Sequence, residues 1–180
     1  MRSFIPRAAF VALGACLLSG CIDSAKPILT DSKPLLGQHL RLQTYSLDSK
    51  GVSDGPEQAE YVWKGSYYAH VSGGMKDVPG FTVHPFEHGD YIVQTRPSGS
   101  DKTVDYALLH PFVAGVYQAV AIDENDATAA VRAANCETTK GSSCRVETRA
   151  QLWALARATA ARPKDRGGLA IKLPFKQSAK

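Results

Sequence analysis

The chain has 180 residues, 44% of them hydrophobic, which is enough for one domain with a proper core. Eight basic and fourteen acidic residues give residues 21–131 a formal charge of −6, whereas eleven basic and three acidic residues give residues 132–180 a charge of +8. The sequence has no glycine loop that could cradle a phosphate and no interleaved basic and aromatic residues, which argues against nucleotide or nucleic-acid binding. The basic part either faces an anionic partner or attracts the acidic part of the same chain.

The first twenty residues have the composition of an export signal. Arg2 and Arg7 are followed by an uncharged apolar run at residues 8–18. This run is shorter than the roughly 20 residues that span a bilayer, and small residues follow it, as they do before a cleavage site. The run ends in Leu-Ser-Gly-Cys at residues 18–21.

These four residues, in this context, resemble the lipobox of bacterial lipoproteins. The resemblance implies that residues 1–20 are a signal peptide removed before Cys21, and that Cys21 then carries diacylglycerol and an acylated amino group. It also implies a membrane-anchored protein of the cell envelope. Since Ile22 rather than Asp follows the cysteine, the family's sorting pattern points to the outer membrane, facing the periplasm. The rest of the chain resembles small uncharacterised lipoproteins of proteobacteria only loosely, and the resemblance implies no functional residue besides Cys21.

Two cysteines remain once the leader and the lipidated residue are set aside. They are Cys136 and Cys144, separated by a Gly-Ser turn. An exported protein folds in an oxidising compartment, so the pair predicts a disulfide. A redox or metal pair is the alternative, but the spacing is not that of a Cys-x-x-Cys motif.

Residues 21–34 are expected to be a lipidated N-terminus and flexible tether, because Pro27 and Pro34 bracket a polar stretch without a clear period. A single domain is expected over residues 35–175, followed by a disordered tail at 176–180.

A repeated pattern in the first part of that domain predicts β-hairpins. Three times, apolar residues lead to a glycine, one residue follows, and a tyrosine opens another β-prone run. Glycine supplies the positive φ angle of a tight turn, and tyrosine suits a half-buried strand. His-Pro-Phe occurs twice, and its proline should mark a strand edge or a bulge. The three glycine–tyrosine pairs are Gly65 and Tyr67, Gly89 and Tyr91, and Gly115 and Tyr117.

Two helices and a last strand are expected after this region. Asp123 or Asn125 caps an alanine-rich segment, and Thr148 with Gln151 three residues later has the spacing of a capping box. Pro163 should end the second helix, and residues 169–173 should form the last strand. The expected fold is therefore α+β: an antiparallel meander of about six or seven strands, with two C-terminal helices packed on one face.

Candidate reaction centres are few. His84, His88 and His110 could converge as metal ligands, because two of them occupy matching positions in the repeat. A proline-flanked histidine at a strand edge is, however, more often part of the turn. No Ser-x-x-Lys motif occurs, and the Gly-x-Ser-x-Gly run at residues 51–55 lies in an expected loop rather than at the strand-to-helix turn of a nucleophile elbow. Tyrosines and one tryptophan gather in the β-rich part, where their spacing favours core packing over an exposed binding strip.

The sequence therefore predicts a lipid-anchored envelope protein with a non-catalytic binding or structural role and no cofactor. The expected partners are the membrane, through Cys21, and an envelope protein, lipopolysaccharide or peptidoglycan; nucleic acid is not expected. Two alternatives stay open. One is an inhibitor of periplasmic enzymes that offers the Cys136–Cys144 loop, and the other is a hydrolase or metal-dependent enzyme that uses the three histidines.

Overall fold

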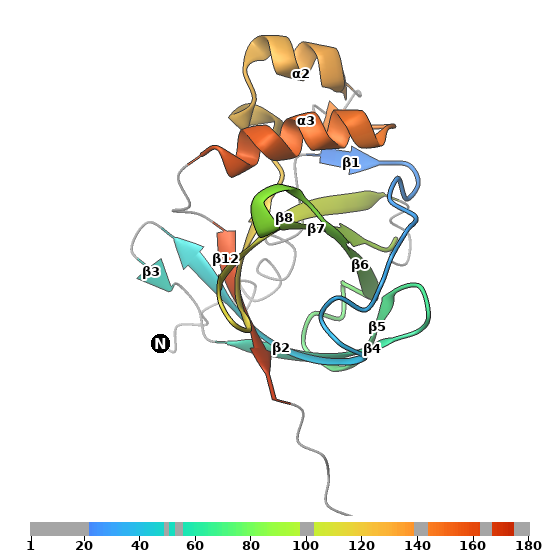
Figure 1. Cartoon of the computed structure of the whole chain (residues 1–180), viewed down its shortest axis with the longest axis vertical. Coiled ribbons are helices and arrows are strands. Elements are labelled where there is room, and N and C mark those ends of the chain that lie inside the picture. The colour runs from blue at the N-terminus through green and yellow to red at the C-terminus, as the bar shows by residue number, and fades with distance from the viewer. Residues whose placement is uncertain are drawn as a thin grey trace, which may run out of the picture.

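The computed structural model describes residues 22–48, 51–52, 56–97, 103–138, 144–162 and 167–174. Within these ranges, eight antiparallel strands close into a barrel with two short helices at one side (Figure 1). Around the barrel the strands are β2 (His39–Asp48), β4 (Glu57–Trp63), β5 (Tyr68–Gly73), β6 (Gly80–Pro85), β7 (Tyr91–Thr95), β8 (Val104–Val113), β9 (Val116–Ala121) and β12 (Gly167–Leu173).

The barrel corrects the predicted fold class. The meander prediction is right for β4 to β9, where each strand pairs with the next along the chain. The sheet is not open, however, because β12 pairs with both β2 and β9, and β9 also pairs with β8. The protein is thus mostly β rather than α+β, and the closed barrel leaves its eight strands no free edge.

The glycines and prolines of the repeat act as predicted. Gly65, Gly89 and Gly115 all have positive φ angles, of 84°, 86° and 80°, and each lies between two paired strands. Pro85 is the last residue of β6, and the pairing of β8 with β9 shifts register between Pro111 and Val113. Local turn chemistry therefore sets these strand boundaries.

The alternation of side chains along the barrel strands divides the core in two. On β8, Tyr106 and Leu108 belong to a cluster outside the barrel, together with the buried face of helix α3 (Arg149–Ala160). Ala107 and Leu109, between them in sequence, belong to a second cluster that fills the barrel. One face of the sheet therefore packs on α3, and the other encloses the barrel lumen.

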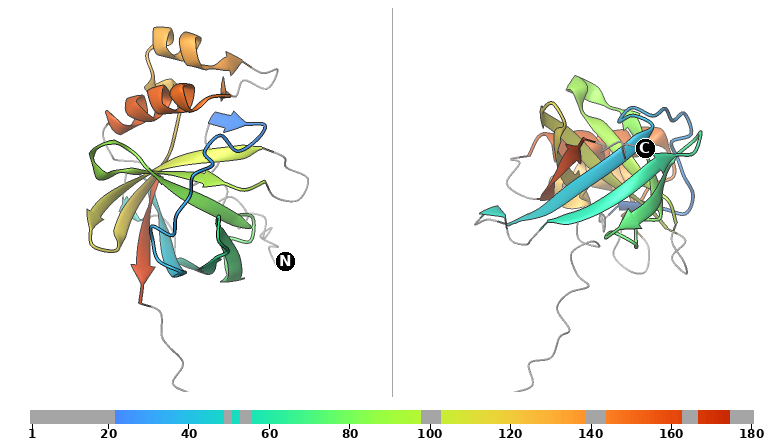
Figure 2. Two further views of the ribbon diagram at one scale, coloured as in Figure 1. Left: turned by 45° about the vertical axis from the view of Figure 1, so that its right-hand side comes forward. Right: turned by 90° about the horizontal axis from the view of Figure 1, so that it is seen from below.

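The second predicted helix is confirmed. Thr148 and Gln151 form the capping box, and the predicted apolar face of α3 is buried. The first helix begins later than predicted. Asp123 caps only the 3-10 turn η2 (Glu124–Asp126), and Thr128 caps α2 (Ala129–Asn135). The two helices do not lie side by side on the barrel, since α2 lies on the far side of α3 (Figure 2).

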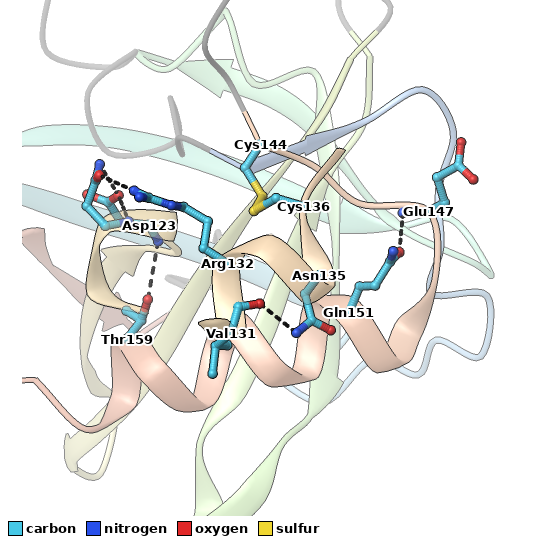
Figure 3. Close-up of a disulfide and its surroundings, with 10 residues drawn as sticks. Asp123, Val131, Arg132, Asn135, Cys136, Cys144, Glu147, Gln151 and Thr159 are labelled. Carbon is cyan, nitrogen blue, oxygen red and sulfur yellow. Dashed lines mark hydrogen bonds between the residues drawn. A yellow bond between two sulfur atoms is a disulfide. The ribbon is translucent and has the colours of Figure 1, made fainter. Parts of the chain in front are cut away.

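The predicted disulfide is confirmed. Cys136 follows α2, and Cys144 opens β11 (Cys144–Arg145), which pairs with β10 (Glu137–Thr138). The bond thus ties the end of α2 to the strand that precedes α3 (Figure 3). A 2-residue strand, β3 (Gly51–Val52), pairs with β2. Pro163, residues 176–180 and the proposed signal peptide lie outside the described residues.

The segment at residues 22–34 is not the flexible tether that we expected at residues 21–34. It begins with β1 (Ile22–Ser24), which pairs with β8 on one side and with β11 on the other. Ile22 is fully buried. The chain then runs along the outside of the barrel to β2, as the blue segment in Figure 1, and we refer to residues 22–36 as the strap. The prediction was wrong because it rested on the mostly polar composition of the segment, whereas its few apolar residues, such as Ile22 and Leu29, are buried.

Buried polar side chains of the barrel hold the strap. Gln94, on β7, is 3% exposed. Its Oε1 accepts hydrogen bonds from the amides of Ile28 and Leu29, each at 2.9 Å, and its Nε2 donates to the Leu29 carbonyl at 3.0 Å. Further along, the hydroxyl of Tyr68 accepts from the Leu36 amide at 2.9 Å. The side chain of Gln94 therefore supplies the strap backbone with the hydrogen bonds that a neighbouring strand would otherwise make.

Candidate binding site: the barrel lumen

The lumen contains an apolar cavity of about 70 Å³. Its walls come from six barrel strands, the loop between β5 and β6, and the strap, and Thr44 supplies the only hydroxyl besides that of Tyr117. Burial raises the pKa of the Tyr117 phenol, so no lining group is charged at neutral pH. The lining residues are Leu36, Leu42, Thr44, Met75, Val78, Phe81, Val93, Ala107, Leu109, Tyr117, Ala119 and Ala170.

Three alanines account for the empty space. Ala107, Ala119 and Ala170 lie on β8, β9 and β12, three strands that are neighbours around the barrel. Alanine is depleted in strands because it offers little surface for packing. At about 24 cal/mol per Å³, an empty cavity of this size costs roughly 1.7 kcal/mol of stability. The barrel therefore keeps a void that one larger side chain would fill.

Aromatic side chains close the rest of the lumen. Tyr61 lies edge-on to Phe81, and Tyr68 stacks on Phe81, with ring centroids 4.9 and 5.2 Å apart. Tyr61 and Tyr68 are buried, so these tyrosines belong to the core, as their spacing in the sequence predicts. Burial, with a smaller contribution from the Glu57 carboxylate, raises the pKa of Tyr61. Packed aromatic rings thus fill the part of the lumen that borders the cavity at Phe81.

The cavity reaches the surface. Met75, Tyr117 and Ala119 are only partly buried, whereas Ala107 and Phe81 are buried. The cavity is therefore a pocket with an entrance rather than a sealed void, so a ligand can enter without unfolding the barrel.

A second, more polar cavity of about 290 Å³ lies outside the barrel, beneath the strap. Asp31 of the strap, His84 of β6, and Arg149 and Trp153 of α3 line it. The Arg149 guanidinium lies 4.4 Å from the centre of the Trp153 ring, and the ring of Phe86 meets Trp153 edge-on. This cavity joins strap, barrel and helix.

The three predicted metal ligands are not brought together. His84 lines the cavity beneath the strap, and His88 is exposed in the 3-10 turn η1 (Glu87–Gly89) with a φ of 56°. His110 pairs instead with Asp90, with Nδ1 2.6 Å from Oδ1. Across the described ranges, His, Cys, Asp and Glu form no group of three that could hold a metal ion. The matching repeat positions do not converge because β7 lies between β6 and β8, and His88 is exposed in η1.

His84 makes the fold sensitive to acid. It is 5% exposed, and its Nε2 lies 2.8 Å from the Thr82 hydroxyl. Burial lowers its pKa; a hydrogen bond with the Asp31 backbone opposes this shift, the Arg149 charge adds to it, and the Asp31 carboxylate again opposes it. Because the folded pKa lies below the unfolded value of about 6.5, the unfolded chain binds more protons, and stability falls as pH drops below that value.

We therefore expect the free energy of unfolding to decrease between pH 7 and pH 5, with His84 contributing up to about 1.4 kcal/mol per pH unit. Urea titrations at several pH values measure this slope. His84→Gln should flatten the profile, whereas His88→Gln, which alters an exposed histidine, should retain the wild-type slope. Equal slopes for all three proteins would show that His84 does not carry the effect.

Sequence reasoning missed the lumen because the sheet was expected to be open. The signal that could have indicated it is the set of alanines within runs that are otherwise β-prone, such as Ala107 in "VDYALLH". Gln94 was also missed, although a single glutamine within "YIVQT" stands out among apolar neighbours. Cys21 lies outside the described residues, so the structure leaves its lipidation untested.

No family model, no curated protein and no solved structure matches this chain. Among the residues that the structure describes, no helix is both long and apolar enough to cross a membrane.

Proposed function

We propose that the protein is anchored to a membrane of the cell envelope, has a non-catalytic binding role in the periplasm, and uses the barrel lumen as its binding site. The observation that carries the binding role is the apolar cavity, which opens to the surface and is lined by no group charged at neutral pH. Such a site removes apolar surface from water but supplies neither an acid nor a base for a reaction.

The anchoring part of the proposal rests on the lipobox-like residues 18–21. The Cys136–Cys144 disulfide is in keeping with an oxidising compartment such as the periplasm. Ile22 after the cysteine favours the outer membrane. The proposal also includes an envelope protein, lipopolysaccharide or peptidoglycan as a further partner.

The anchoring is tested by comparing the wild-type chain with Cys21→Ser in cells fed radiolabelled palmitate. The wild type should incorporate the label, lose residues 1–20 by intact mass and sediment with membranes, and Cys21→Ser should do none of these. Cys16→Ser, in the proposed leader, is the matched control and should behave as wild type. A wild-type protein that is soluble and unacylated would refute the anchor.

A further inference from the structure

We infer that the lumen binds one slender, unbranched acyl chain, inserted methyl end first, with the polar head left at the entrance. The inference deepens the proposed binding role and rests on it, because it names the class of ligand for the same cavity. Three properties of the cavity carry it: its size, its apolar lining and its opening to the surface.

The size excludes bulky ligands. A cavity of about 150 Å³ in another protein admits benzene, and the lumen offers about 70 Å³, less than half of that volume. The volume is therefore small for a ring, whereas the end of a straight alkyl chain fits. The lining excludes a polar ligand, because a buried hydroxyl or charge would find almost no hydrogen-bonding partner there.

The opening sets the direction of binding. Met75 and Tyr117, which line the cavity, are partly exposed, so a chain can enter there from the surface. The apolar lining cannot bond a charged group, so the chain enters methyl end first and its charged head stays in water.

The ligand is a free acyl chain rather than the acyl group proposed for Cys21. Ile22, the next residue, packs in the cluster between the barrel and α3. The lumen belongs to the other cluster, on the opposite face of the barrel wall. An acyl group on Cys21 would thus start on the wrong side of the strands.

The test is a titration of the full chain carrying Cys21→Ser, with its alanine methyl groups labelled with ¹³C, against octanoate below its micellar concentration. This protein has no acyl group of its own, so the response reports the free acid alone. We expect shifts of the Ala107, Ala119 and Ala170 methyl signals, and nuclear Overhauser effects from the terminal methyl of octanoate to them. A phenyl-terminated acid, 3-phenylpropanoate, should cause neither. Equal binding of the phenyl acid, or no response to octanoate, would overturn the inference.

A variant that fills the cavity locates the site independently. Ala119→Leu should weaken octanoate binding at least about tenfold, because the new side chain occupies the void. Ala130→Leu, on the exposed surface of α2, is the matched control and should bind as the parent does. If Ala119→Leu fails to fold by circular dichroism, the smaller Ala107→Val replaces it. Unchanged affinity in a folded, filled variant would place the ligand elsewhere and refute the inference.

The two proposals fail in different ways. A wild-type protein without the palmitate label and without membrane association would refute the anchor and leave the octanoate result intact. A negative octanoate titration would refute the acyl ligand while the anchor stands.

Discussion

Gln94→Leu is expected to lower the free energy of unfolding by about 2–4 kcal/mol, because it deprives three buried backbone groups of the strap of their partner. The leucine has nearly the same size but cannot bond the Ile28 and Leu29 amides or the Leu29 carbonyl. The strap should then separate from β7 and let water reach those groups. Urea unfolding measures the total loss, and hydrogen exchange of residues 25–36 should accelerate before the barrel itself opens.

Gln58→Leu is the matched control for this prediction. Gln58 is also a strand glutamine, but it is exposed, and its side chain bonds to the side chains of Arg41 and Gln43. Its loss should change the free energy of unfolding by less than about 0.5 kcal/mol. If Gln94→Leu were equally mild, or if the strap amides exchanged at wild-type rates, Gln94 would not hold the strap.

Leu155→Ala in α3 is expected to destabilise the protein by about 3 kcal/mol, since the side chain is fully buried between the helix and the barrel. The loss combines the transfer of the missing methyl groups with the cost of the void they leave. Ile92 and Leu108, which belong to the same cluster, come from strands that curve around the lumen, so they can move little to fill the space. Urea unfolding followed by far-UV circular dichroism gives the difference.

Leu35→Ala provides the comparison for Leu155→Ala. Leu35 is 40% exposed, so the same truncation should cost less than about 1 kcal/mol. Should the two variants prove equally stable, α3 would not be packed on the barrel as the structure has it.

Features that depend on neighbours in sequence could be predicted. The turns at Gly65, Gly89 and Gly115 need a positive φ that glycine adopts freely, and this need is visible in the sequence alone. The capping box of α3 is equally local, because Thr148 and Gln151 satisfy each other's backbone groups within one helical turn. The disulfide could be predicted because only two cysteines remained and the export signal indicated an oxidising compartment.

Features that depend on distant segments could not be predicted. Barrel closure requires β12, at residues 167–173, to pair with β2, at residues 39–48. The sequence of neither strand indicates that they pair. The lumen exists only once that pairing is made, and so its alanines had no visible role. The strap depends on Gln94, about 65 residues away from the backbone groups that it bonds. The histidines were grouped by repeat position, but β7 separates the strands that carry His84 and His110.

The strap also limits how far the domain could extend above a membrane. If residues 22–34 were a free linker, they could extend over about 45 Å and carry the barrel well away from the lipid surface. Because Ile22 is paired in β1 and buried, these residues belong to the folded domain and do not act as a free linker. A protein acylated at Cys21 would therefore sit flush on the bilayer, with one side always turned toward the lipid. Its partners would have to come to the membrane surface, and peptidoglycan strands far from the lipid would lie beyond its range.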